Sequence, residues 1–219
     1  MNIIKKKNFI FIKKNWSKIS ANLIYSEILK IHSKKETVNI ALTGGRTSKK
    51  IYKYLNKLLE KYEKKINFYL GDERYVSYRS NLSNSFSIKK NLLNYRNKNH
   101  KFFTPNTKNK IQHETLNYAK KINVIDILLL SLGDDGHIAS IFPKSKIINS
   151  ANKYIYLKND WEKFYRISIS PRFIRKIKNK FIFVEGKKKL IVFNTLRNNK
   201  NYMLPANLVY KDGIWLIKK

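Results

Sequence analysis

The chain has 219 residues, 42% of them hydrophobic, and no cysteine, so it can bury one substantial core but cannot form disulfides, thiolate nucleophiles or cysteine-ligated metal sites. No apolar run approaches the roughly 20 residues that a membrane helix needs, and we expect one cytoplasmic domain spanning residues 1–219. Its 47 Lys and Arg against 14 Asp and Glu give a formal net charge of +33.

Hydrophobic periodicity predicts that strands and helices alternate along the chain. In chain order we expect a strand at 8–12, a helix at 16–31, a strand at 37–42, a helix complete by residue 60, a strand at 66–70, a helix near 83–93, a polar surface excursion at 94–110, a helix around 112–121, a strand at 124–132 with a short helix soon after it, strands at 165–170 and 181–186, a helix at about 187–197 and a last strand at 213–217. This alternation predicts a three-layer α/β domain with a mostly parallel sheet covered on both faces.

Three polar loops that contain glycine follow three of the expected strands. They are TGGRTS at 43–48, GDERYV at 71–76 and SLGDDGH at 131–137. Ligands of such sheets bind beyond the carboxyl ends of the strands. If the strands are parallel, the three loops share one edge and form the candidate site there.

The first two loops have features suited to an anion. Gly44 and Gly45 precede a helix, so backbone N–H groups and the positive end of the helix dipole can face a phosphate, with Thr47 as a cap or a hydroxyl donor. A tight turn with an ordinary cap explains these residues equally well. Arg74 could hold a phosphate or carboxylate bidentately, although a local ion pair is the simpler interpretation. Neither the P-loop spacing nor the dinucleotide fingerprint is present, so we expect no cofactor.

His137 is the histidine with a catalytic context. Asp135 lies two residues before it, and Gly136 between them permits unusual dihedral angles. An aspartate that fixes the tautomer and orientation of a histidine is a recurring arrangement for a general base. The other histidines lie in polar contexts, where we expect surface positions and no metal site: His32, His100 and His113.

In these residues the sequence resembles the bacterial type of 6-phosphogluconolactonase. The segments ALTGGRTSKKIYKYL, GDERYV with Ser83 and Asn84, and LGDDGHIASIFP look like the three signature loops of that family in order and spacing. Weaker similarity continues through YRISIS, FVEGKKK and MLPANLV to GIWLI, so the resemblance covers nearly the whole chain. Glucosamine-6-phosphate deaminase shares DGHIA but continues with Asn-Glu-Pro, whose Glu is catalytic, whereas this chain continues with residues 140–143, SIFP.

The resemblance implies a Rossmann-like sheet, shared with the deaminase and with ribose-5-phosphate isomerase, and hydrolysis of 6-phospho-D-glucono-1,5-lactone. It implies His137 as the general base, oriented by Asp135. The implied substrate-binding residues are Gly44, Gly45, Arg46 and Thr47 for the phosphate, Arg74 and Lys189 as charged clamps, and Asp72 and Asn84 for the sugar hydroxyls. Lys189 takes this role only through the family's Gly-x-x-Lys pattern. The chain departs from the family at Ser48 and Ser77, where proline is usual and the loops could be looser, and at Ser131, where glycine is usual.

The net charge leaves a second interpretation open. Clustered cations bind nucleic acid by releasing its counterions. Here lysines are spread along the whole chain, and Lys, Asn and Ile are abundant together, which favours the coding bias of an A+T-rich genome. We therefore expect a phosphorylated sugar lactone as the partner, no membrane, no specific nucleic acid, and a monomer. The alternatives are a sugar-phosphate enzyme of the deaminase or isomerase class, and a basic nucleic-acid-binding protein that has kept the fold.

Overall fold

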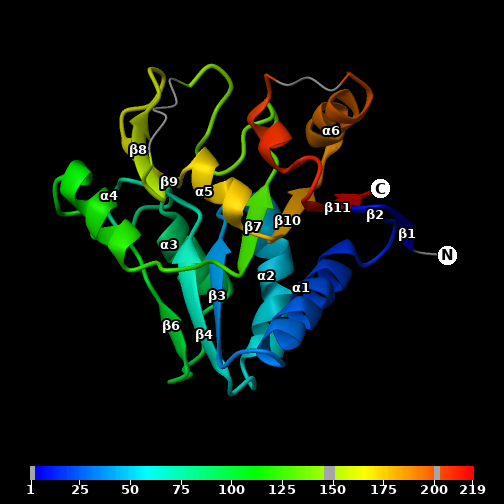
Figure 1. The fold of residues 1–219 in the computed structure, drawn as a ribbon, viewed down its shortest axis with the longest axis horizontal. Coiled ribbons are helices and arrows are strands. Elements are labelled where there is room, and N and C mark those ends of the chain that lie inside the picture. The colour runs from blue at the N-terminus through cyan, green and yellow to red at the C-terminus, as the bar shows by residue number, and fades with distance from the viewer. Residues whose placement is uncertain (1–2, 146–150, 200–202) are drawn as a thin grey trace.

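One eight-stranded sheet runs through the molecule in the order β1-β2-β11-β10-β7-β3-β4-β6 (Figure 1). The computed structural model describes residues 3–145, 151–199 and 203–219. Every neighbouring pair in this sheet is parallel except the hairpin β1–β2. Its strands are β1 (Ile3–Lys6), β2 (Phe9–Ile12), β3 (Thr37–Leu42), β4 (Lys65–Leu70), β6 (His100–Phe102), β7 (Ile127–Ser131), β10 (Asn179–Val184) and β11 (Ile214–Lys218).

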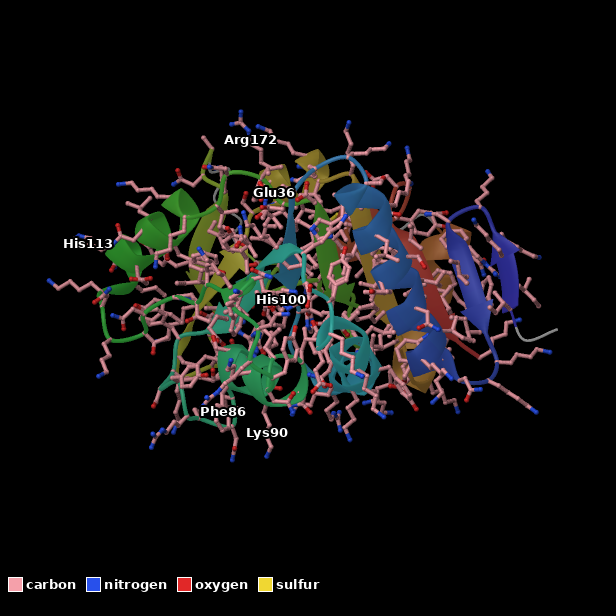
Figure 2. All side chains as sticks on the ribbon, turned by 90° about the horizontal axis from the view of Figure 1, so that it is seen from below. Glu36, Phe86, Lys90, His100, His113 and Arg172 are labelled. Atoms are coloured by element: carbon pink, nitrogen blue, oxygen red, sulfur yellow. The ribbon has the colours of Figure 1, made fainter. Side chains whose placement is uncertain are left out.

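Helices flank this sheet, which confirms the predicted α/β class with a mostly parallel sheet (Figures 1 and 2). They are α1 (Trp16–His32), α2 (Arg46–Leu59), α3 (Asn84–Asn91), α4 (Ile111–Lys120), α5 (Pro171–Lys176), α6 (Lys187–Asn199) and the 3-10 helix η1 (Pro205–Val209). α1 packs against α2 and α2 against α3, whereas α5 packs against η1. In the described ranges, no helix combines the length and the apolarity needed to cross a membrane.

The central strands are apolar along nearly their whole length because helices or loops cover both of their faces. Leu128, Leu129 and Leu130 in β7 are all fully buried, although alternate residues of a strand point to opposite faces. A strand that faced water on one side would alternate apolar and polar residues instead. The core therefore lies on both faces of β7 and its neighbours, and the strand ends are held in fixed positions.

A second, three-stranded antiparallel sheet lies beside the first, and the sequence analysis missed it. It has the order β5-β9-β8, with β5 (Asp72–Arg74), β8 (Tyr154–Lys158) and β9 (Tyr165–Ile169). Residues 71–76 were expected to form a loop, and 165–170 a strand of the main sheet. The alternating pattern of YRISIS indicates a strand, but pairing between distant segments decides which sheet the strand joins.

Other boundaries also differ from the expectations. β6 lies inside the expected surface excursion, β1 precedes the first expected strand, and β7 begins at Ile127 rather than at 124. α5 begins at Pro171 because proline suits the first helical position, and the Oγ of Ser170 accepts a hydrogen bond from the backbone N–H of Phe173 at 3.2 Å. The short helix expected after residue 137 is not found within residues 138–145. Ile138 and Ile141 form an isolated β-bridge there, and residues 146–150 lie outside the described ranges.

Two of the three histidines expected at the surface are at least partly buried. His113 is exposed on α4, as expected (Figure 2). His32 is buried, and its ring nitrogens contact the carbonyl oxygen of Lys65 at 3.0 Å and the hydroxyl of Tyr62 at 2.7 Å. His100 is partly buried, and its Nδ1 lies 2.8 Å from the hydroxyl of Tyr95. Burial lowers the pKa of both His32 and His100, which favours their neutral forms.

Leu130→Ala is expected to lower the free energy of unfolding by about 2–5 kcal/mol, because it leaves a cavity in the doubly covered centre of the sheet. The matched control is Leu116→Ala on α4, where 47% of the leucine is exposed. Urea denaturation followed by circular dichroism measures both variants. Equal losses in the two variants would contradict the central position of β7.

Candidate active site

The three glycine-containing loops meet at one edge of the main sheet and enclose a cleft of about 1190 Å³. The structure brings together in this cleft all the site residues expected from the sequence: Gly44, Gly45, Arg46, Thr47, Asp72, Arg74, Asn84, Asp135, His137 and Lys189. They come from segments more than one hundred positions apart. The parallel arrangement of β3, β4, β7 and β10 places their carboxyl ends at this edge.

The turn between β3 and α2 is held by buried hydroxyl groups. Ser48 donates its hydroxyl to the carbonyl oxygens of Gly44 at 2.8 Å and Gly45 at 2.9 Å. Tyr52 donates to the carbonyl oxygen of Thr43 at 2.7 Å and accepts from its N–H at 3.2 Å. Ser48 therefore ties this turn together. Gly45 has no side chain to cap α2, so the first N–H groups of the helix are left for an anion.

Lys189 reaches this turn from the first turn of α6. Its Nζ donates to the Oγ1 of Thr47 at 3.2 Å and to the Oγ of Ser131 at 3.1 Å. Burial lowers the pKa of Lys189, although nearby Asp134 and Glu185 act in the opposite direction. Ser131 thus supplies an acceptor for this cation. Thr47, Ser131 and Lys189 together form a partly buried, positively charged corner of the cleft.

Glu73 holds the second loop in place. Its buried carboxylate accepts hydrogen bonds from the backbone N–H groups of Asn84 and Ser85, both at 2.7 Å, and of Arg74 at 2.8 Å. Burial raises the pKa of Glu73, while these hydrogen bonds favour the ionised form. Ser83 caps α3, because its Oγ accepts from the N–H of Phe86 at 3.1 Å. Glu73 therefore anchors the start of α3 to β5.

Asp72 and Asn84 connect the three loops. Asn84 donates its Nδ2 to the backbone oxygen of Asp72 at 2.9 Å, and Asp72 accepts at Oδ2 from the hydroxyl of Ser140 at 2.7 Å. A Cβ atom on Gly44 would lie 1.8 Å from the Oδ1 of Asn84, so only glycine fits there. Oδ1 of Asp72 and Oδ1 of Asn84 accept no hydrogen bond from the described part of the chain.

Arg166 is a cleft residue that the sequence analysis missed. It is 7% exposed, lines the cleft, and lies on β9 directly opposite Arg74 on β5. Arg74 donates its Nη1 to the carbonyl oxygen of Leu82 at 2.7 Å. The only sequence signal was that Arg166 lies in the alternating strand YRISIS. Alternation shows that successive side chains point to opposite faces of the strand, but not which face lies against the cleft. Further lysines at the rim were also missed: Lys50, Lys187, Lys188, Lys218 and Lys219.

His137 is oriented from three sides. Its Nδ1 lies 2.5 Å from the Oδ1 of Asp135, and the same oxygen accepts from the backbone N–H of His137 at 3.1 Å. Gly136 has the positive φ, 88°, that this short turn needs. A Cβ atom on Gly133 would lie 2.1 Å from Nδ1, and the ring of Phe142 packs at 4.4 Å between centroids. The Nε2 atom makes no hydrogen bond to any described residue, so it is available to a ligand in the cleft.

The Asp135 carboxylate is the charged partner of this histidine. Burial acts to raise the pKa of Asp135, but the hydrogen bonds from His137 outweigh it and hold the pKa below its usual value. An ionised Asp135 favours the tautomer of His137 that carries the proton on Nδ1. Across residues 3–145, 151–199 and 203–219, no group of three or more His, Asp or Glu side chains is placed to hold a metal ion. An oriented histidine among cations suits an enzyme that acts on a small anionic molecule.

Comparison with known proteins agrees with this class. The family described as glucosamine-6-phosphate isomerases/6-phosphogluconolactonase matches residues 13–217, and the chain belongs to this family. A protein of Dictyostelium discoideum named probable 6-phosphogluconolactonase is 29% identical, over 94% of each chain. The 6-phosphogluconolactonase of Haemophilus influenzae is 27% identical, over 90% of this chain and 89% of its own.

Solved structures share the fold. The 6-phosphogluconolactonase of Thermotoga maritima superposes with a TM-score of 0.84 at 23% identity, over 96% of this chain and 99% of its own. A putative 6-phosphogluconolactonase of Neisseria gonorrhoeae gives a TM-score of 0.87 at 20% identity, with the same coverage.

Gly133→Ala is expected to abolish most of the catalytic activity, because the new methyl group occupies the place of the His137 ring. Such a clash typically costs about 1–3 kcal/mol of stability. The same substitution in a His137→Ala background should cost much less, since the three nearest atoms to the methyl group all belong to that ring. Urea denaturation of the four proteins gives the coupling energy, and a coupling near zero would contradict this contact.

Proposed function

We propose that this chain is a 6-phosphogluconolactonase, which hydrolyses 6-phospho-D-glucono-1,5-lactone to 6-phospho-D-gluconate. Membership of the family supports the activity, as do relatives of that name matched along about nine-tenths of their length. The observation that carries the assignment of chemistry is the pair of His137 and Asp135 in a cleft lined by arginines and lysines. A dianionic, cyclic ester fits both features.

His137 is the general base and acid in this proposal. Its Nε2 takes a proton from a water molecule as the water oxygen bonds to the lactone carbonyl carbon. When the bond from that carbon to the ring oxygen breaks, the imidazolium returns the proton to the departing oxygen. Asp135 holds Nδ1 and stabilises the positive charge on the ring between the two steps. A positioned acid–base group of this kind contributes about 10²–10⁴-fold to the rate.

The phosphate group binds at the corner formed by the start of α2 and Lys189. Gly44, Gly45, Arg46 and Thr47 contribute backbone N–H groups and the Thr47 hydroxyl there, and Lys189 and Arg74 contribute positive charge. Charge-assisted hydrogen bonds suit a dianion. The free Oδ1 atoms of Asp72 and Asn84 are available to accept hydrogen bonds from sugar hydroxyls. No metal ion or organic cofactor is needed for this reaction.

Two observations bear on the rival functions. The segment SIFP, residues 140–143, contains no carboxylate: Ser140 binds Asp72, and Phe142 packs on His137. Release of ammonia from glucosamine 6-phosphate would be the result that favours the deaminase. In Figure 2, side chains that end in nitrogen project on every side of the outline, and lysines occur along the whole chain, which agrees with a coding bias. A single domain over residues 1–219, a monomeric state and a cytoplasmic location stay predictions.

His137→Asn is expected to lower kcat by about 10²–10⁴-fold, since asparagine cannot carry the proton, while the protein still folds and binds 6-phosphogluconate. His113→Asn on the exposed face of α4 is the control and should keep full activity. Rates are measured with the fast spontaneous hydrolysis subtracted. Near-normal turnover by His137→Asn would show that another group is the base.

Lys189→Ala should weaken binding of the phosphorylated lactone by about 1.5–3 kcal/mol and leave unphosphorylated gluconolactone nearly unaffected. The reason is that Lys189 is held at the proposed phosphate corner by Thr47 and Ser131. Lys18→Ala on the surface of α1 removes the same charge at a site outside the cleft and controls for long-range steering. KM values for the two substrates decide the matter: equal increases for both would place Lys189 away from the phosphate.

A further inference from the structure

Arg166 is held on its edges and on its faces. Its Nε donates to Glu162 Oε2 at 2.7 Å and its Nη2 donates to Oε1 of the same carboxylate. Its Nη1 donates to the hydroxyl of Ser140 at 3.1 Å. The guanidinium carbon lies 5.2 Å from the centre of the Phe142 ring and 5.5 Å from that of Phe164. An arginine fixed in this way loses little conformational freedom when it binds an anion.

The hydrogen bonds leave part of Arg166 free for a ligand. Of the five N–H donors of a guanidinium, three are used by Glu162 and Ser140, and one remains on each terminal nitrogen. Asp72, the other nearby carboxylate, is 3.9 Å from Nη1, beyond hydrogen-bond distance. Because Arg166 lines the cleft, these two N–H groups are available to oxygens of a bound anion.

Glu162 is itself anchored, and it lies outside the cleft lining. It belongs to the connection between β8 and β9, its side chain is 12% exposed, and its Oε2 accepts from Asn159 Nδ2 at 2.8 Å. Its backbone N–H donates to the carbonyl oxygen of Asn159 at 3.1 Å. Although burial acts to raise the pKa of Glu162, the hydrogen bonds from Arg166 and Asn159 lower it, so the carboxylate stays ionised.

We propose that Glu162 is a positioning residue for substrate binding. Its carboxylate binds Nε and Nη2 of Arg166 and so holds the guanidinium with its remaining N–H groups directed at the phosphate of the substrate. This inference rests on the proposed function, since it assigns a role in binding the same phosphorylated lactone. Glu162 touches neither the reacting atoms nor His137. Its removal therefore changes KM for the phosphorylated substrate and leaves kcat nearly unchanged.

The direction of the effect follows from the geometry. Without the carboxylate, Arg166 keeps its charge in a nearly buried place with Asp72 as the nearest remaining anion. Removing one partner of a buried ion pair leaves an uncompensated charge, and Oδ2 of Asp72 lies only 3.9 Å from Nη1 of Arg166. Arg166 then turns toward Asp72, and the N–H groups that served the phosphate are used inside the protein.

The experiment compares Glu162→Gln with Glu36→Gln, which changes the net charge by the same amount. Glu36 directly precedes β3, at the opposite end of the parallel strands from the cleft, and is exposed beside Lys65 (Figure 2). For Glu162→Gln we expect KM for the phosphorylated lactone to rise roughly tenfold or more, the loss of about one charge-assisted contact. We expect kcat, and KM for unphosphorylated gluconolactone, to change less than about twofold, and Glu36→Gln to match the wild type.

A double-mutant cycle separates positioning from a loss of folding. If Glu162 acts through Arg166, Glu162→Gln should add little to the KM of an Arg166→Lys variant, because lysine cannot be gripped at two nitrogens. Thermal denaturation confirms that each variant is folded at the assay temperature. An unchanged KM in Glu162→Gln, equal changes for both lactones, or full additivity with Arg166→Lys would overturn the proposal. Absence of lactonase activity in the wild type would instead refute the proposed function.

Discussion

The hydrogen bond from the hydroxyl of Ser140 to the carboxylate of Asp72 joins the segment after β7 to β5 of the second sheet, at the cleft. Ser140 follows the loop that carries His137, whereas Asp72 begins the strand that carries Arg74. Asp72 also accepts from Asn84, whose amide lies against Gly44 in the first loop. Because Ser140, Asp72 and Asn84 are buried, loss of one partner would leave an unsatisfied polar atom in the interior. The relative positions of His137, the cleft cations and the glycine turn therefore depend on this small set of contacts.

The net charge of +33 explains little about the cleft. What distinguishes the cations that face it is how each one is held: Lys189 by two hydroxyls, Arg74 by a backbone carbonyl and Arg166 by a carboxylate. A lysine on the surface keeps its conformational freedom and is screened by salt within about 10 Å. A fixed, partly buried cation has already lost that freedom and is weakly screened, so it binds a phosphate more tightly. The scattered surface lysines draw anions toward the protein without selecting among them.

Two of the three positions at which the resemblance implies a departure from the family pattern supply hydroxyls to the framework of the cleft. The hydroxyl of Ser48 binds the carbonyl oxygens of the glycine turn, which a proline could not do. The hydroxyl of Ser131 accepts from Lys189 at the end of β7, where a glycine would offer no side-chain acceptor. Ser77, the third departure, is exposed in a surface loop. The hydroxyls of the buried Ser48 and the partly buried Ser131 thus both have hydrogen-bond partners, which a hydroxyl withdrawn from water needs.

The sequence by itself determined the alternation of strands and helices, the three loops at the strand ends and the pair of Asp135 and His137. These features are local: periodicity is set by neighbouring residues, and the two members of the pair are two positions apart. The tertiary structure alone decided that β5, β8 and β9 form a second sheet, that Arg166 faces the cleft and that Glu162 grips it. It also explains why residue 133 is glycine, because the ring of His137 occupies the place where a side chain at that position would lie. Such contacts join segments as distant as Asp72 and Ser140, which are 68 positions apart, and no local pattern encodes which distant partners meet.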